Sequence, residues 1–350
     1  AIKKLNTQIM AGEGPDILVL DGLPLESYMK KGILCELDGF VEDLGQEKAF
    51  ENLLRAFQTG GNIYAIPGQV KFPVMLGREK DIAKMTGLSS AADGIEQMRL
   101  DAPGKDLIGL CSEKAVMRLF AIISSQEWKK NDEIDRNAVA EFLIRTKRIY
   151  EAQMNGMEGE SLERLRQSNE YYVQSEGENW MYDLMHYGYF MDYVAGYSNA
   201  FIGISGSPDS YMELASISKA NGLEDTVFVP MEGEEGRVFI PEMVLGISAA
   251  TAKKELAEDF LEMFFGKENQ CRLSGYAVNR EAFMEAFAPK VEEVGENGEY
   301  RKFGVIDEGG REIWLDIFIP ADEEIVAVTE WMETAKIPYN ICKHRPVWGA

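Results

Sequence analysis

The chain has 350 residues, of which 45% are apolar and 27% are charged, so it is neither disordered nor small, and two domains or lobes are expected. Its 59 acidic side chains outnumber the 36 basic ones, and the resulting net charge of -23 repels nucleic acid and anionic lipid. No apolar run approaches the ~20 residues that a membrane helix needs. Composition therefore argues against nucleic acid and the membrane surface as partners.

Histidine and cysteine are too scarce to indicate a metal or redox site. The two histidines, His186 and His344, are far apart in the sequence, and the four cysteines contain no C-x-x-C pair. We therefore expect no metal, no cofactor and no disulfide. Four buried or partly buried thiols are expected instead: Cys35, Cys111, Cys271 and Cys342.

The first predicted elements alternate between helix and strand. Apolar spacing predicts a helix over residues 2–9, and the unbroken apolar run at 16–20 predicts a strand covered on both faces, as in a parallel or mixed sheet. A second helix is expected over residues 23–31, with Asp21 or Gly22 as its cap. This order favours an α/β layer architecture.

The same alternation continues along the chain. Further strands are predicted at 107–110, 197–204 and 244–247, and further helices at 116–123, 138–152 and from 254 onward. In the last of these helices two neighbouring rows form one apolar face: Leu256, Phe260 and Phe264, and Ala257, Leu261 and Phe265. Trp314 and Trp331 lie in apolar stretches and are expected in the core.

Three segments carry motifs in a definite order. They are LNTQIMAGEGPDI at 5–17, continued by Asp21, Tyr28 and 31–37; NIYAIP at 62–67, followed by KDI at 80–82; and LGIS at 245–248 with KKELAEDFL at 253–261. Together they resemble the extracellular solute-binding proteins of ABC importers. Their order and spacing are similar to the carbohydrate-type branch, to which maltose-binding protein belongs.

This resemblance implies an α/β, two-lobed, periplasmic-binding-protein-like (type II) fold with a hinge and an inter-lobe cleft. The expected lobes are 1–73 plus 237–275 and 77–235 plus 277–350. The family match begins after the family's first strand, so we expect the chain to be truncated within lobe 1, without that strand. An unpaired sheet edge would then need cover.

The implied function is capture of a small polar solute, with sugar favoured, outside the cell, at the cell surface or in the periplasm. ABC permease subunits are the implied partners, and a lipid anchor outside this chain is the expected link to the membrane. The protein is not expected to be an enzyme. Two alternatives stay open: a ligand-sensing module of a larger surface protein, and, less favoured, a carbohydrate-active enzyme with a carboxylate pair that no motif locates.

Loops that follow predicted strands supply the first candidate ligand-binding residues. Asp21 follows the 16–20 strand, where a carboxylate can accept bonds from sugar hydroxyls, or it caps the next helix. Gln69 and Phe72 lead into the hinge, where Gln69 can hydrogen-bond ligand. Phe72 either offers a ring face to a sugar or packs in the hinge core.

Four more polar candidates lie in corresponding loops. Glu113 begins a helix, so it is either a ligand contact or a charge that complements the helix dipole. Ser205 and Ser207 occupy the loop where relatives commonly carry a stacking tryptophan, and the alternative is a plain polar turn. Glu242 either points toward the cleft or lies on the surface.

The missing tryptophan directs attention to an aromatic-rich run at 180–190. Trp180 or Tyr182 is the expected replacement as a stacking surface, although aromatic rows at helical spacing are also typical of a core. We further expect Asp21 and Glu113 to face each other across the cleft.

Overall fold

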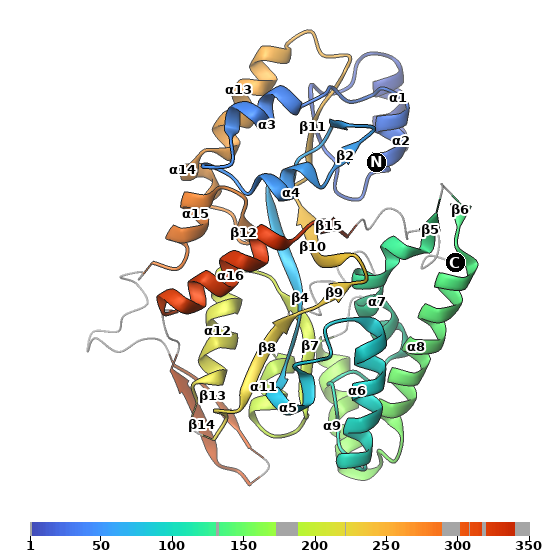
Figure 1. Ribbon diagram of the computed structural model, residues 1–350, viewed down its shortest axis with the longest axis vertical. Helices are drawn as coiled ribbons and strands as arrows, with labels where there is room; N and C mark the ends of the chain where they lie inside the picture. The colour runs from blue at the N-terminus through green and yellow to red at the C-terminus, as the bar shows by residue number, and fades with distance from the viewer. Residues whose placement is uncertain are drawn as a thin grey trace. The chain divides into compact units, whose positions relative to one another are not determined.

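The computed structural model describes residues 2–130, 133–172, 188–220, 222–288, 302–307, 309–316 and 320–339. These residues form two compact units (Figure 1). Unit 1 comprises the described parts of Ala1–Lys71, Phe239–Phe287 and Val326–Ala350, and unit 2 those of Phe72–Val238 and Ala288–Ile325. The expected boundaries differ from these units in the C-terminal part, because residues 277–287 and the chain from Val326 belong to unit 1.

Unit 1 combines short strands with helices from both ends of the chain. Its helices are α1 (Ile2–Met10), α2 (Leu25–Lys30), α3 (Asp38–Leu44), α4 (Glu51–Arg55), α13 (Lys254–Phe265), α14 (Lys267–Gln270), α15 (Arg280–Glu285) and most of α16 (Asp322–Thr334). Its own strands are β1 (Ile17–Val19), β2 (Gln58–Thr59), β3 (Asn62–Ile63), β11 (Leu245–Ile247), β12 (Tyr276–Ala277) and β15 (Ile337–Pro338). Two longer strands, β4 (Gln69–Arg78) and β10 (Gly236–Glu242), contribute to both units.

Strand β1 departs from the expected fully covered strand. It pairs antiparallel with β11, with Ile17 opposite Ile247, and Leu18 is buried. Val19 is 55% exposed, so the two faces of β1 differ and the expectation of cover on both faces is wrong. An unbroken apolar run specifies neither the strand's partners nor what lies over each face.

The second helix also starts later than expected. α2 begins at Leu25 with Pro24 at its N-cap, and this helix has no side-chain cap hydrogen bond. Pro24 suits this position because a proline has no amide hydrogen that needs a partner. The predicted cap at Asp21 or Gly22 is therefore wrong.

Only one of the two apolar rows of α13 is buried. Ala257, Leu261 and Phe265 face the interior, and the Phe265 ring lies 6.0 Å from that of Phe40 in α3. Leu256 and Phe260 are 63% and 41% exposed. The helix was predicted correctly, but the width of its buried face was overestimated.

Aromatic packing and hydrogen bonds hold the later segments in unit 1. The Phe283 ring of α15 packs edge-on against Phe50 with the ring centroids 5.2 Å apart. Asn52 Nδ2 donates to the carbonyl of Met332 in α16 at 2.7 Å. Trp331, on the same helix, is buried as expected. These contacts explain why residues far apart in the sequence share one core.

Unit 2 carries the longer helices. They are α5 (Glu79–Ile82), α6 (Leu88–Asp101), α7 (Glu113–Ser124), the 3-10 helix η1 (Ser125–Trp128), α8 (Arg136–Met154), α9 (Gly159–Tyr172), α11 (Gly188–Val194) and α12 (Pro208–Ser218). Its own strands are β5 (Lys129–Lys130), β6 (Glu133–Ile134), β7 (Ala200–Ser205), β8 (Thr226–Pro230), β9 (Glu232–Gly233), β13 (Lys302–Ile306) and β14 (Glu312–Asp316).

The sheet of unit 2 is built on β4. This strand pairs antiparallel with β7, with Phe72 opposite Ser205, and also antiparallel with β8, with Val74 opposite Pro230. β4 also pairs antiparallel with β10 and β12, and β1 pairs antiparallel with β11, whereas a parallel or mixed sheet was expected. Residues 70–77 are buried throughout, as suits a strand with neighbours on both edges.

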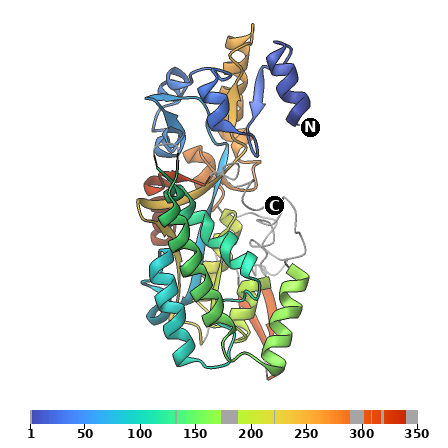
Figure 2. The ribbon, with the colours of Figure 1, turned by 90° about the vertical axis from the view of Figure 1, so that its right-hand side faces the viewer.

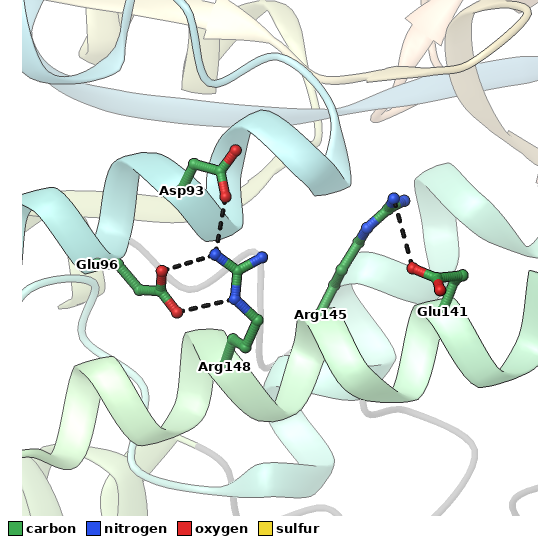
Figure 3. Close-up of polar contacts among 5 residues, drawn as sticks. All are labelled: Asp93, Glu96, Glu141, Arg145 and Arg148. Atoms are coloured by element: carbon green, nitrogen blue, oxygen red, sulfur yellow. Dashed lines mark hydrogen bonds and ion pairs between the residues drawn. The ribbon is translucent and has the colours of Figure 1, made fainter.

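Helices α6, α7 and α8 run side by side in unit 2 (Figure 2). Arg148 of α8 joins α6: its Nε and Nη2 donate to the two carboxylate oxygens of Glu96 at 2.8 and 2.6 Å, and Nη2 also lies 2.8 Å from Asp93 (Figure 3). Arg145 forms an ion pair within α8, with Glu141 at 3.5 Å. Among the described residues, no helix has the length and apolar character needed to span a membrane.

The hairpin of β13 and β14 exposes an aromatic residue. Trp314 lies opposite Gly304 and is 62% exposed, so the expectation of a core residue is wrong. A two-stranded antiparallel hairpin leaves one face to solvent, and Trp314 lies on that face.

Candidate functional site

Four polar side chains of unit 1 gather where β4 pairs with β10. We call Asp21, Gln69, Lys71 and Glu242 the polar cluster. Glu242 lies opposite Gln69 in the ladder, and its two carboxylate oxygens accept bonds from Lys71 Nζ at 2.6 Å and Gln69 Nε2 at 2.8 Å. The structure thus brings together three of the predicted residues, Asp21, Gln69 and Glu242, with one that was not predicted.

Two members of the polar cluster are buried, so their polar groups need partners within the protein. Gln69 and Lys71 are only 6% and 7% exposed, whereas Glu242 is half-buried. Gln69 Oε1 also accepts from the Gly275 amide at 2.7 Å, so both ends of its amide are bonded. A buried lysine requires a charge partner, and the Glu242 carboxylate supplies it.

The turn between β10 and β11 shapes the cluster. Met243 has a φ of 51°, a left-handed conformation that is uncommon for a residue with a side chain. The Gly68 amide donates to the carbonyls of Glu242 and Met243, and the Val244 amide donates to Asp21 Oδ2 at 3.3 Å. Backbone strain of this kind concentrates at functional sites, so it supports a functional role for this turn.

Asp21 lies next to this turn and not on α2. The residue is exposed as a whole, but partial burial of the carboxyl raises the pKa of Asp21 to about 6. The hydrogen bond from Val244 acts in the opposite direction, and the negative charge of Glu242 raises the pKa further.

Lys71 is the residue that sequence reasoning missed. Along β4, Gln69 and Lys71 alternate with the apolar Val70 and Phe72, so the two polar side chains share one face of the strand. The alternation of polar and apolar residues in this part of the sequence could have identified Lys71 as a neighbour of Gln69. The lysine adds a cationic donor to a site with two carboxylates, and such a set can bond both donor and acceptor groups of a polar ligand.

The other predicted residues belong to unit 2. Phe72 is fully buried, which agrees with the core alternative and leaves no ring face exposed for stacking. Glu113 is exposed in the first turn of α7, whose N-cap is Ser112, with Ser112 Oγ accepting from the Ala115 amide. Glu113 thus occupies the position where a negative charge complements the helix dipole.

The two predicted serines have structural contacts. Ser205 is fully buried at the end of β7, and its Oγ lies 3.1 Å from Ser210 Oγ. Ser207 is the N-cap of α12, and its side chain accepts from the Ser210 amide. Trp180 and Tyr182 lie outside the described residues.

A buried network holds the segment that leads to Glu113. Asp106 Oδ1 accepts from the Gly109 amide at 2.8 Å and from Gln153 Nε2 at 2.7 Å, while Gln153 Oε1 accepts from the Leu107 amide at 2.9 Å. Because side chains bind these amides and Gly109 has a φ of 73°, residues 107–110 do not form the predicted strand. Burial raises the pKa of Asp106 to about 6.

Metal and thiol chemistry have little support in this part of the chain. Within the described residues, no three His, Cys, Asp or Glu side chains gather as a metal site requires. Cys35, Cys111 and Cys271 are in the thiol form, and Cys271 is exposed, contrary to expectation, whereas Cys342 lies outside these residues.

We compared the chain with known protein families, curated proteins and solved structures. A family model described as bacterial extracellular solute-binding protein matches residues 1–288. Among curated proteins, no sequence matches this chain.

Solved structures show the fold. An extracellular solute-binding protein of family 1 from Alicyclobacillus acidocaldarius subsp. acidocaldarius DSM 446 is 14% identical, with a TM-score of 0.52, covering 99% of this chain and 78% of that one. The sugar-binding protein MalE from Xanthomonas citri is 14% identical, with a TM-score of 0.53, covering 99% and 79%. Thiaminase I from Bacillus thiaminolyticus is 15% identical over 96% and 83%, but its TM-score of 0.47 is too low to bear on activity.

The family match over residues 1–288 agrees with the order of the sequence motifs and with the two α/β units. The fold is that of the two-lobed periplasmic solute-binding proteins. This chain belongs to the family of bacterial extracellular solute-binding proteins.

Proposed function

We propose that this chain captures a small polar solute, with carbohydrate as the favoured class, and delivers it to the membrane subunits of an ABC-type importer. The observation that carries the proposal is the polar cluster, in which Asp21, Gln69, Lys71 and Glu242 meet beside a strained turn. Capture takes place at the cell surface or in the periplasm, and a lipid anchor outside this chain is the proposed attachment.

The chemistry of the cluster suits a sugar. Each hydroxyl of a sugar is both a donor and an acceptor, and the cluster offers carboxylate acceptors together with a lysine donor. Lys71 compensates the charge of Glu242, and Asp21 adds one further carboxylate, so the cluster suits a neutral ligand that carries hydroxyl donors. The solved MalE of Xanthomonas citri is described as a sugar-binding protein, and its fold similarity supports the same class here.

Two strands connect the proposed lobes. β4 passes from unit 1 to unit 2 between Lys71 and Phe72, and β10 crosses back between Val238 and Phe239. We assign the hinge to these two crossings. In the sequence, the first directly follows Lys71 of the polar cluster and the second lies shortly before Glu242. Ligand binding would then bias a hinge closure by its additional contacts in the closed state.

A thermal-shift screen against mono- and oligosaccharides tests this proposal, followed by calorimetry on each hit. A ligand at 100 times its Kd stabilises the protein by about 2.7 kcal/mol, which is an easily measured shift. Asp21→Ala should weaken binding of that sugar by about 5- to 100-fold, because it removes a charge-assisted acceptor. Asp21→Asn keeps an oxygen for the Val244 amide and should lose less.

Asp43→Ala is the matched control, since Asp43 is an exposed aspartate of α3 outside the polar cluster. Its affinity should equal that of the unaltered protein. Two results would contradict the proposal: no sugar stabilises the protein, or a sugar binds with unchanged affinity in both Asp21→Ala and Lys71→Ala.

A further inference from the structure

Unit 2 contains a cavity that the proposed function does not use. Its volume is about 430 Å³, within the range of small-molecule sites. It lies among α5, the C-terminal end of α6, the loop at 102–105 and the segment at 193–199. None of its lining residues belongs to the polar cluster.

One buried polar group lines this cavity without a partner. Ser198 is only 5% exposed, and its Oγ has no hydrogen-bond partner among the described residues. The backbone here is well held, because the Ser198 amide donates to the Asp192 carbonyl and the Asn199 amide to the Asp106 carbonyl. A buried hydroxyl without a partner is costly, so its position in a cavity wall points to a bound group.

Three cationic side chains line the same cavity: Arg78, Lys80 and Lys105. Arg78 lies 3.8 Å from Asp225, and Lys80 lies 3.7 Å from Asp81, distances too long for hydrogen bonds. Lys105 is exposed, and its side chain forms no ion pair with any described residue. Each cation thus retains N–H donors for a ligand. Such a group of cations stands out in a chain whose net charge is -23.

A buried arginine fixes the wall that carries Lys105. Arg99 is 6% exposed and donates to the carbonyls of Ala102 and Lys105, both at 2.8 Å. It also donates to the carbonyls of Ala152 and Gln153 at 2.7 and 2.6 Å. These four hydrogen bonds all go to backbone oxygens, so the guanidinium adds positive charge beneath the loop and holds the loop in place.

The remaining lining limits the kind of ligand. Asp81 and Asp101 supply negative charge at the cavity, so the cations exceed the lining carboxylates by only one, which favours a ligand of low charge. Apolar contacts are available from Met98, Val194 and Leu223. A small molecule with one anionic group and a short carbon skeleton matches both features.

We propose that this cavity is a second binding site, which takes a small organic anion of carboxylate or phosphate type. The anionic group lies between Lys105 and Arg78 and accepts a hydrogen bond from Ser198 Oγ. The short carbon skeleton packs against the apolar lining. This site is independent of the proposed sugar site, since the two sets of residues do not overlap.

Calorimetry and thermal shift with succinate and, in a separate arm, inorganic phosphate test the proposal on the whole chain. Ser198→Ala should weaken binding about three- to tenfold by loss of one hydrogen bond. Lys105→Glu should weaken it more than tenfold and remove most of its dependence on NaCl concentration. Because Lys105 is exposed, this variant should fold normally.

Ser125→Ala is the matched control, because Ser125 is also buried with an unpartnered Oγ but does not line this cavity. It should bind the anion like the unaltered protein. Without anion, Ser198→Ala should melt at the same or a higher temperature, whereas the anion should raise the Tm of the unaltered protein more than that of the variant. The proposal is overturned if neither probe binds at 10 mM or if Ser198→Ala and Lys105→Glu leave binding unchanged.

Discussion

Asp106 offers a direct test of how burial sets a charge in this protein. The residue is 5% exposed, and its Oδ1 accepts from the Ile108 and Gly109 amides and from Gln153 Nε2. Desolvation nevertheless dominates and raises the pKa of Asp106 from 3.8 to about 6. Asp106→Asn keeps an oxygen for these three donors and removes the charge.

The size of the effect follows from proton linkage. The folded state binds the proton more tightly than the unfolded chain, so this contribution to stability is present below pH 3.8 and is lost as the pH rises through about 6. The difference between a pKa of 3.8 and one of about 6 corresponds to a loss of roughly 3 kcal/mol at pH 8 and about half of that at pH 5. Any loss of stability caused by the new Nδ2 group is the same at both pH values, so it cancels when the two values are compared.

Urea unfolding at pH 5 and pH 8, followed by tryptophan fluorescence, measures this difference. The free energy of unfolding of Asp106→Asn, relative to that of the unaltered protein, should be roughly 1–2 kcal/mol higher at pH 8 than at pH 5. Asp43→Asn, at an exposed site, serves as the control and should show no such change. A relative stability for Asp106→Asn that is equal at both pH values, or that falls as the pH rises, would refute the reasoning.

Three further substitutions probe packing and charge pairs. Phe72→Ala should lower the free energy of unfolding by about 3–5 kcal/mol in urea titrations because the ring is fully buried; a loss below 1 kcal/mol would contradict a core role. Lys71→Met should cost about 1–3 kcal/mol by leaving Glu242 without its cation, and adding Glu242→Gln should recover most of it; a double mutant that is merely additive would argue against the pair. Arg148→Lys should lower stability by about 0.5–1 kcal/mol, since lysine cannot bond both Glu96 oxygens, and an unchanged melting curve would show that this exposed contact contributes nothing.

Sequence reasoning worked best in selecting residues of unit 1 that lie close together in the structure. Asp21, Gln69 and Glu242 were selected because they follow or end predicted strands, and the structure places them in one cluster with Lys71. Ser205 and Phe72 were selected on the same grounds but are buried, because position in a loop or strand does not show which way a side chain points. The ligand contacts of all these residues stay predictions, as does the opposition of Asp21 and Glu113.

Features that depend on neighbouring residues and on motif order can be predicted from the sequence alone. Helices α7, α8 and α13 follow from apolar spacing every three or four residues, and family membership follows from three motifs in the right order. These signals are local, so they are readable without knowing what packs against them.

Pairings between distant segments, in contrast, become visible in the folded protein. Gln69 and Glu242 are 173 residues apart, and their contact depends on the antiparallel register of β4 with β10. The exposure of Val19 depends on which strand pairs with β1, and the absence of a strand at 107–110 depends on Asp106 and Gln153 binding its amides. Periodicity along the chain records which face is apolar, but a hydrogen bond between remote segments is set by register and packing, which no local pattern encodes.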